Sequence, residues 1–204
     1  MIDNPQDTNM TVGDVTIAPH NIWVLVKVKK DISIDPNNTE GAKREKEIAE
    51  IILHYKSLGS GTINAVKNYG TENEENVGTP HTAQVTIDGI NYEIKFNETV
   101  TKNIFVKVDL TTEIKDEKKK EELKTTIQNT IVDYINSLEI GQDVLMSRVV
   151  SVINSKNTYT DFGFDVTDIK IGAENPIETT MVSVYPYEQA KTTIDNVTIT
   201  IDGK

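Results

Sequence analysis

The sequence predicts an α+β protein of two small modules, each with a mainly antiparallel sheet packed with one or two helices. Two observations lead to this prediction. Apolar and polar residues alternate in several short stretches of the 204-residue chain, a period typical of strands with one buried face. Between these stretches, apolar residues recur every three or four positions, as they do in amphipathic helices. The modules are expected at residues 14–99, with β-α-β order, and at residues 100–204, with β-α-α-β order.

The N-terminal residues differ in character from the stretch that follows them. Residues 1–13 are polar, lack any hydrophobic period and contain a proline and a glycine, which predicts a flexible tether. Residues 21–28 alternate in polarity after Pro19 and are expected to form a strand. The first module is therefore expected to begin with a turn and a strand.

The first helix is expected to follow a cap at Asn38 or Thr39 and to end before the sequence G-S-G at residues 59–61. Its apolar stripe is predicted at Ile48, Ile51, Ile52 and Tyr55. Residues 61–80 have little periodicity and are expected to form a surface loop. Two alternating runs within residues 83–96 are separated by Asp88-Gly89, a pair that favours a type I′ hairpin turn.

The second module is expected to start with a strand at residues 103–110 and to continue with a long helix from about Asp116. The glycine at position 141 ends this segment, and Asp143 is a candidate N-cap of a shorter helix. Further strands are expected within residues 164–171, 181–185 and 197–201. The predicted buried stripe of the long helix comprises Leu123, Ile127, Ile131, Tyr134, Ile135 and Leu138, and that of the shorter helix Leu145, Val149, Val152 and Ile153.

Composition narrows the range of functions. The formal net charge is −11, which disfavours binding to nucleic acids or to anionic membranes, because both require a basic surface. The absence of cysteine excludes disulfides, thiolate metal sites and cysteine nucleophiles. No secretory signal is expected in the first 20 residues, and no apolar run approaches the roughly 20 residues that span a bilayer. Neither nucleic acid nor membrane is therefore an expected partner.

Candidate chemical groups are few, and none forms a specific motif. The histidines at positions 20, 54 and 81 lack metal-ligand spacing, although spacing alone leaves a Ser-His-Asp triad open. The glycines around Ser60 follow a helix, which is the wrong order for a phosphate-binding loop. The basic run at residues 118–120 is flanked by acidic residues and favours a helix face with ion pairs. The acidic residues Glu72, Glu74, Glu75, Asp161 and Asp165 lack the spacing of a calcium loop and favour solvated loops. We expect no catalytic residue, no metal site and no cofactor.

Aromatic residues suggest one interaction site. Trp23 lies in an apolar strand and is expected in the core. Tyr185 and Tyr187 flank a proline in a polar segment near the C-terminus. Tyrosine provides a large contact area at a small entropy cost, so this pair is the candidate protein interface.

Several short segments carry a family resemblance through their order. V-K-V-D-L lies in the strand at 103–110, I-x-x-Y-I-N-S-L ends the long helix, and I-G-Q-D-V leads into the second helix. Upstream are A-P-H-N-I-W-V-L-V, E-I-A-E-I-I, G-S-G and G-T-P-H. In this order they resemble the middle and C-terminal regions of baseplate J-like proteins, the wedge components of contractile phage tails and related particles. The resemblance covers most of residues 10–170.

The resemblance implies a structural wedge subunit, or a fragment of one, of a contractile phage tail, prophage or tailocin baseplate. Such a protein acts by assembly with other wedge and hub proteins and with copies of itself, without catalysis. It implies a location in the virion or tailocin baseplate, assembled in the bacterial cytoplasm. Family members are usually longer, so we expect the isolated chain to be mainly monomeric. An alternative is a bacterial surface or adhesion module, which the Asn- and Thr-rich strands favour; an enzyme fragment is a third.

Overall fold

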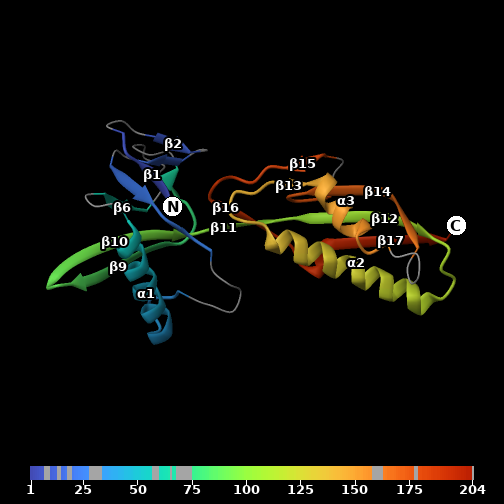
Figure 1. Cartoon of the computed structure of the whole chain (residues 1–204), viewed down its shortest axis with the longest axis horizontal. Coiled ribbons are helices and arrows are strands. Elements are labelled where there is room, and N and C mark those ends of the chain that lie inside the picture. Colours follow the sequence, from blue (N-terminus) through green and yellow to red (C-terminus); the bar gives the residue numbers. More distant parts are fainter. Residues whose placement is uncertain are drawn as a thin grey trace. The chain divides into compact units, whose positions relative to one another are not determined.

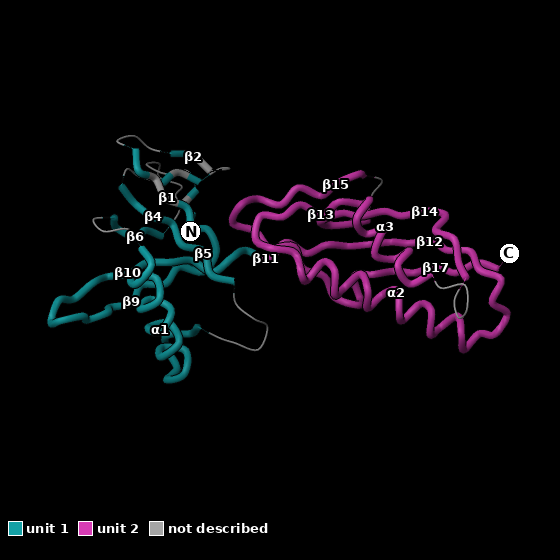
Figure 2. Tube along the Cα trace, in the orientation of Figure 1, with its two compact units in different colours: residues 1–100 teal, residues 101–204 magenta. Residues whose placement is uncertain are grey.

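The computed structural model divides the chain into two compact units, residues 1–100 and residues 101–204 (Figure 2). In the described part of the chain, three α-helices and several sheets of mostly antiparallel strands confirm the α+β class (Figure 1). The residues that the structure describes are 1–6, 10–12, 15–17, 20–27, 34–56, 60–64, 66–67, 75–157, 163–176 and 179–203.

Unit 1 is built from short strands around one helix and one long hairpin. Its strands form three sheets, with the orders β1-β4-β6, β5-β10-β9 and β2-β3-β7-β8. The elements are β1 (Ile2–Asn4), β2 (Met10–Val12), β3 (Val15–Ile17), β4 (Asn21–Trp23), β5 (Leu25–Val26), α1 (Thr39–Tyr55), β6 (Gly61–Ile63), β7 (Val66–Lys67), β8 (Glu75–Asn76), β9 (Pro80–Ile87) and β10 (Ile90–Glu98). The strand β11 (Val100–Asn103) begins at the boundary between the units.

The expected tether at residues 1–13 is wrong where the structure describes it. β1 pairs antiparallel with β4, so that Ile2 lies opposite Trp23. β2 pairs antiparallel with β3. Short polar segments lack a hydrophobic period of their own, but their backbone groups can still complete a neighbouring sheet. The N-terminal residues therefore belong to unit 1.

Where the structure describes it, the segment at 61–80 contains short strands, so the expected surface loop is wrong there. β6 runs parallel to β4, and β7 pairs with both β3 and β8. Each of these strands has two or three residues, which is too short for a period of two to be visible in the sequence. Gly59 of the predicted G-S-G helix end lies outside the described residues.

The hairpin of unit 1 confirms its sequence prediction. β9 and β10 pair antiparallel, with Ile87 opposite Ile90 across the turn. Asp88 has a φ of 52° and Gly89 a φ of 78°, the positive values that a type I′ turn requires. α1 packs on this hairpin (Figure 1). The hydrophobic core between them comprises Ile22, Val24, Ile34, Ala49, Ile52, Ala83, Val85, Ile94 and Phe96.

Helix α1 begins at its expected cap but buries a different face. The Asn38 side chain accepts a hydrogen bond from the Gly41 N–H at 2.6 Å. The buried residues of the helix are Gly41, Glu45, Ala49 and Ile52, whereas Ile51 and Tyr55 of the predicted stripe are exposed. Gly41 is on the buried side because a side chain there would collide with the Asp35 backbone. Glu45 is tolerated there because its carboxylate contacts His81.

Unit 2 has a mixed three-stranded sheet with the order β14-β12-β17. The central strand β12 pairs antiparallel with β14 and parallel with β17. Two smaller pairs, β11-β16 and β13-β15, complete the unit. Its elements after β11 are β12 (Phe105–Thr112), α2 (Glu117–Ser137), β13 (Val144–Leu145), α3 (Met146–Asn154), β14 (Phe164–Gly172), β15 (Met181–Val182), β16 (Glu188–Lys191), the 3₁₀ helix η1 (Ile194–Asn196) and β17 (Val197–Gly203).

The core of unit 2 lies between one face of this sheet and the helices α2 and α3. Alternate residues of β12 are fully buried, and the intervening ones are half-buried on the opposite face. Asp116 caps α2 by accepting a hydrogen bond from the Lys118 N–H at 2.9 Å. The predicted stripe of α2 is buried except for Tyr134, which is half-buried against the same core. The buried residues are Leu123, Ile127, Ile131, Ile135 and Leu138.

A β-bulge interrupts the edge strand β14. The register passes from Asp109 opposite Asp168 to Leu110 opposite Val166, so Thr167 has no partner residue in β12. The Thr167 hydroxyl donates to the Asp109 carbonyl at 2.9 Å. Because the extra residue restores the alternation, the apolar residues of β14 stay on the core-facing side along the whole strand. These core-facing residues are Phe164, Val166, Ile169 and Ile171.

Candidate protein interface

The two candidate interface residues lie at a turn between β15 and β16, and their exposure differs sharply. Tyr185 is 48% exposed, whereas Tyr187 is only 2% exposed. The expectation that both tyrosines offer a contact surface is therefore wrong for Tyr187, which belongs to the interior of unit 2. The polarity of the surrounding sequence could not distinguish the two tyrosines, because the turn leaves the Tyr185 ring exposed and buries the Tyr187 ring.

The buried ring supports the exposed one. The rings of Tyr185 and Tyr187 are stacked, with centroids 5.4 Å apart and planes inclined by 9°. Lys102 places its ammonium group 5.4 Å from the centroid of the Tyr185 ring, within the range of a cation–π interaction. The exposed ring thus contacts both a buried aromatic ring and a cation.

The turn itself is fixed by the carboxylate of Glu188. Glu188 Oε2 accepts a hydrogen bond from the Tyr185 N–H at 2.9 Å and one from Lys102 Nζ at 2.8 Å. The Glu188 N–H donates in return to the Tyr185 carbonyl at 2.8 Å. Lys102 and Glu188 are both mostly buried, so this ion pair is better shielded from water than a surface pair. Both ends of the turn are therefore tied together and to strand β11.

The loop after α2 braces the same turn from the other side. Gly141 has a φ of 72°, and a Cβ at this position would lie 3.0 Å from Pro186 Cα. Its N–H donates to the Glu188 carbonyl at 2.9 Å. Asp143 was expected to cap the next helix, but that prediction is wrong. Its carboxylate accepts a hydrogen bond from the Val184 N–H at 2.7 Å, and α3 begins only at Met146.

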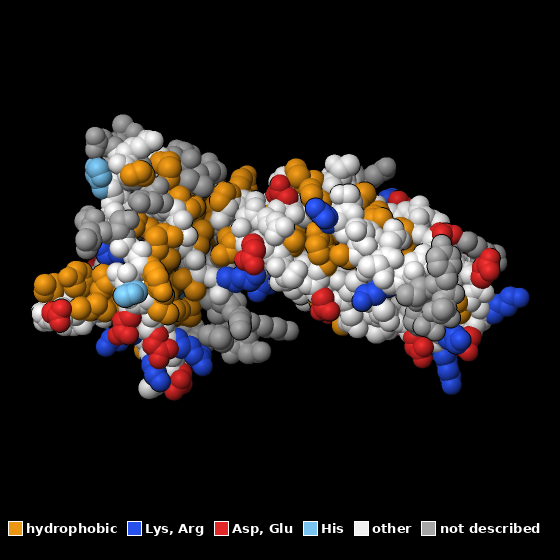
Figure 3. Space-filling model, in the orientation of Figure 1, with side chains coloured by type: hydrophobic (Ala, Val, Ile, Leu, Met, Phe, Trp, Pro, Cys, Tyr) orange, Lys and Arg blue, Asp and Glu red, His pale blue; other side chains and the backbone are white. Residues whose placement is uncertain are grey.

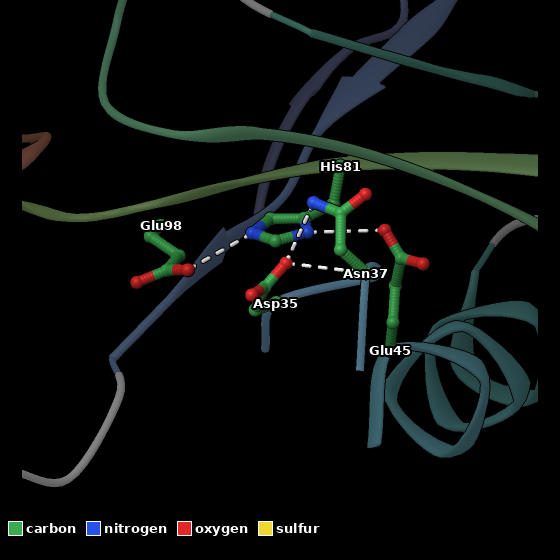
Figure 4. A network of polar contacts seen from close by, with 5 residues as sticks. All are labelled: Asp35, Asn37, Glu45, His81 and Glu98. Carbon is green, nitrogen blue, oxygen red and sulfur yellow. Dashed lines mark hydrogen bonds and ion pairs between the residues drawn. The ribbon is translucent and has the colours of Figure 1, made fainter. Parts of the chain in front are cut away.

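A second polar cluster, in unit 1, is centred on a histidine that the sequence analysis did not single out. His81 Nδ1 lies 3.0 Å from Glu45 Oε1, and Nε2 lies 2.9 Å from Glu98 Oε1 (Figure 4). Its ring also stacks on Phe96, with centroids 4.8 Å apart. The cluster joins α1 to both strands of the hairpin. Near the start of α1, hydrogen bonds from the Asn37 backbone N–H and side-chain amide to Asp35 lower the pKa of that carboxyl group.

The geometry of the histidine cluster favours a structural role. The His81 side chain is only 3% exposed, and each ring nitrogen already faces a carboxylate oxygen. Neither nitrogen is available to a metal ion or a substrate. Sequence reasoning missed the cluster because its members are far apart in the chain and have no motif spacing.

The other chemical candidates do not converge on a site. Among the described residues, no group of three or more His, Asp or Glu side chains is placed to hold a metal ion. His20 and His54 are exposed. The ion pairs of Lys120 with Glu117 and of Lys124 with Glu121 confirm the expected charge-paired face of α2. Glu72, Glu74 and Asp161 lie outside the described residues.

Exposed apolar side chains mark two more positions in unit 1. Ile87 and Ile90 lie beside the hairpin turn, and Ile51 and Tyr55 lie on the solvent side of α1. Figure 3 shows hydrophobic side chains along the hairpin and interleaved charges over the end of α1. Single exposed apolar residues are common in folded proteins, so these positions alone do not identify a partner.

No model of a known protein family matches the chain, and no curated protein matches it in sequence. In the part of the chain that the structure describes, no helix is long and apolar enough to cross a membrane.

Proposed function

We propose that the chain is a structural subunit, or part of one, of the baseplate wedge of a contractile phage tail, prophage or tailocin. In this proposal it acts by protein–protein assembly and catalyses no reaction. Its partners are other wedge and hub proteins and further copies of itself, in a particle assembled in the bacterial cytoplasm. The proposal rests on the order of the family-like segments, supported by their positions in the fold.

One observation carries the proposal. The three segments of unit 2 that resemble baseplate J-like proteins all have structural roles there. V-K-V-D-L is the centre of strand β12, and I-x-x-Y-I-N-S-L supplies the buried end of α2. I-G-Q-D-V contains Gly141 and Asp143, which brace the turn that presents Tyr185. The segments thus lie in the central strand, in the helix that covers it and in the loop beside the turn that carries Tyr185.

The exposed tyrosine gives the proposal its test. Interface hot spots are enriched in tyrosine, and a residue already held in place loses little conformational entropy on binding. The tagged chain should capture baseplate proteins from cells in which particle assembly has been induced. Replacing Tyr185→Ala should weaken the capture by about tenfold or more. Ile194→Ala is the matched control, because Ile194 is a similarly exposed hydrophobic residue of the same unit.

Mass spectrometry of purified particles provides the independent measurement. Peptides of this chain in particles that contain sheath and tube proteins would support the proposal. Their absence from such particles, together with their recovery at the cell surface, would instead favour the adhesion module. Undiminished capture by Tyr185→Ala would refute the role of Tyr185 in the interface. The wedge assignment would then be decided by the mass spectrometry of particles.

The oligomeric state of the isolated chain is a further expectation. A net charge of −11 makes copies repel one another at low salt, so we expect mainly monomers at micromolar concentration. Light scattering over a concentration series measures this directly. A stable ring formed by the chain alone would contradict the expectation.

A further inference from the structure

Among the described elements of unit 2, helices cover only one face of the sheet β14-β12-β17. The hydrophobic core fills the space between α2, α3 and the core-facing residues of the three strands. On the opposite face, the outer face, lie the side chains of Lys107, Asp109, Asp168 and Lys170, which are between 25% and 47% exposed. In the described part of the chain, these four side chains form ion pairs only with one another. The outer face therefore presents its charges to other molecules.

The strand register sorts these charges into two bands. Lys107 lies directly opposite Lys170, and Asp109 lies directly opposite Asp168. The neighbouring strand β17 adds one neutral threonine to each band. The outer face thus has a positive band and a negative band, two residues apart along the strands, and the charges of the two bands cancel.

This register does not favour the stability of the sheet. Like charges directly opposite one another in paired strands are destabilising, whereas opposite charges are stabilising. Each lysine is instead paired along its own strand, at 3.3 Å between Lys107 Nζ and Asp109 Oδ2 and at 3.7 Å between Lys170 Nζ and Asp168 Oδ2. Such exposed pairs compensate charge only weakly. Sheet stability therefore does not explain the two bands, whereas binding of a molecule with matching bands does.

The outer face is complementary to itself under a two-fold rotation. With an axis that crosses the strands between the two bands, the positive band of one copy lies over the negative band of the other. At the end of the face beyond the negative band, Asp165 and Asp202 lie on either side of Thr111. The same rotation places them over the opposite end of the other copy, where Phe105 pairs with Gly172. No carboxylate then lies over another carboxylate.

We propose that the outer face binds the outer face of a second copy of this chain. Lys107 of each copy lies beside Asp109 of the other, and Lys170 of each lies beside Asp168 of the other. The two sheets pack face to face, about 10 Å apart, with their strands antiparallel and nearly aligned. The partner is a second copy because the pattern supplies its own complement, and this inference does not depend on the wedge assignment.

The size of the face determines how strong this contact is. Three strands of about seven residues form a surface of about 14 Å by 23 Å. A stable interface buries roughly 800 Å² on each partner, which is far more than this face offers. We therefore expect the contact to form at hundreds of micromolar or when copies are held together in an assembly, which agrees with a monomer at micromolar concentration.

Sedimentation equilibrium of the full chain tests the proposal. Between about 10 μM and about 1 mM at low salt, the parent should self-associate in the upper part of the range, and added salt should weaken the association. Lys107→Asp/Lys170→Asp makes both bands acidic, and Asp109→Lys/Asp168→Lys makes both basic. Each variant alone should self-associate at least about tenfold more weakly than the parent. An equimolar mixture of the two should associate again, because their bands are complementary.

A matched control separates this contact from general attraction between unlike charges. Glu122→Lys/Asp133→Lys changes the charge by the same amount at exposed positions of α2, which covers the other face of the sheet. Mixed with the acidic variant, it should not restore association. If a variant loses its native circular dichroism, Lys107→Gln/Lys170→Gln is the substitute and should also weaken self-association. No self-association of the parent up to about 1 mM, self-association unchanged in the outer-face variants, or equal restoration by the α2 variant would overturn the proposal.

Discussion

The histidine cluster of unit 1 allows a sharp test of what holds α1 on the hairpin. In His81→Phe the new ring can keep the stacking on Phe96, while both nitrogen contacts are lost. The carboxylates of Glu45 and Glu98 then have no imidazole N–H to accept from. The substitution therefore removes polar contacts while it largely conserves packing volume.

The expected cost follows from the burial of the two carboxylates. The Glu45 side chain is 12% exposed, so water can replace the lost hydrogen bond only in part. The Glu98 side chain is 28% exposed and recovers more of its hydration. A buried acceptor left without a donor costs about 1–3 kcal/mol, and more when it is charged. We therefore expect His81→Phe to lower the free energy of unfolding of unit 1 by about 2–4 kcal/mol.

Urea denaturation followed by tryptophan fluorescence measures this change in unit 1 specifically. Trp23 is the only tryptophan of the chain; it is fully buried, and its Nε1 donates to Asn97 Oδ1 at 3.2 Å. The control is the triple variant Glu45→Leu/His81→Phe/Glu98→Leu. It leaves no orphaned carboxylate and should regain most of the lost stability. A loss of less than about 0.5 kcal/mol in His81→Phe, or a triple variant no more stable than the single one, would refute the reasoning.

Two further predictions concern unit 2. Ile131→Asp places an unpaired charge in the fully buried stripe of α2 and should lower the free energy of unfolding by several kcal/mol. A thermal midpoint within about 2 °C of that of the parent would contradict the burial of this stripe. Burial raises the pKa of Tyr134, and the nearby Arg148 opposes this in part. The resulting stability is present below about pH 10 and is lost as the pH rises through the folded-state pKa. Tyr134→Phe should therefore lose less stability than the parent in denaturant titrations at increasingly alkaline pH, and equal losses would argue against a buried phenol.

Local patterns predicted the elements that are stabilised within themselves. The buried stripe of α2 follows from apolar residues at helical spacing, and its Asp116 cap is adjacent in sequence. The hairpin turn follows from Asp88-Gly89, because these residues adopt positive φ most readily. In each case, the residues that determine the structure lie within one segment.

Features that depend on distant partners were not predictable in this way. Ile51 and Tyr55 match a helical stripe, but both are exposed. Helix α1 instead buries Glu45, because His81 of strand β9 provides a polar partner for its carboxylate. Asp143 has the composition of a cap, yet its partner is a backbone N–H contributed by a segment near β15. The spacing of apolar residues in β14 includes one odd step that only the bulge explains. A sequence pattern records spacing along the chain and does not record which segment lies opposite.

The same sequence separation affects the order in which the chain can fold. The central strand β12 has its parallel neighbour in β17, so that Val106 lies opposite Val197. Contacts between such distant residues form slowly, because a long loop must close before they are gained. During synthesis, residues 1–100 can emerge and pack while β12 still lacks one side of its sheet. Completion of unit 2 therefore waits for its last strand, and until then β12 retains an open edge that is vulnerable to pairing with another chain.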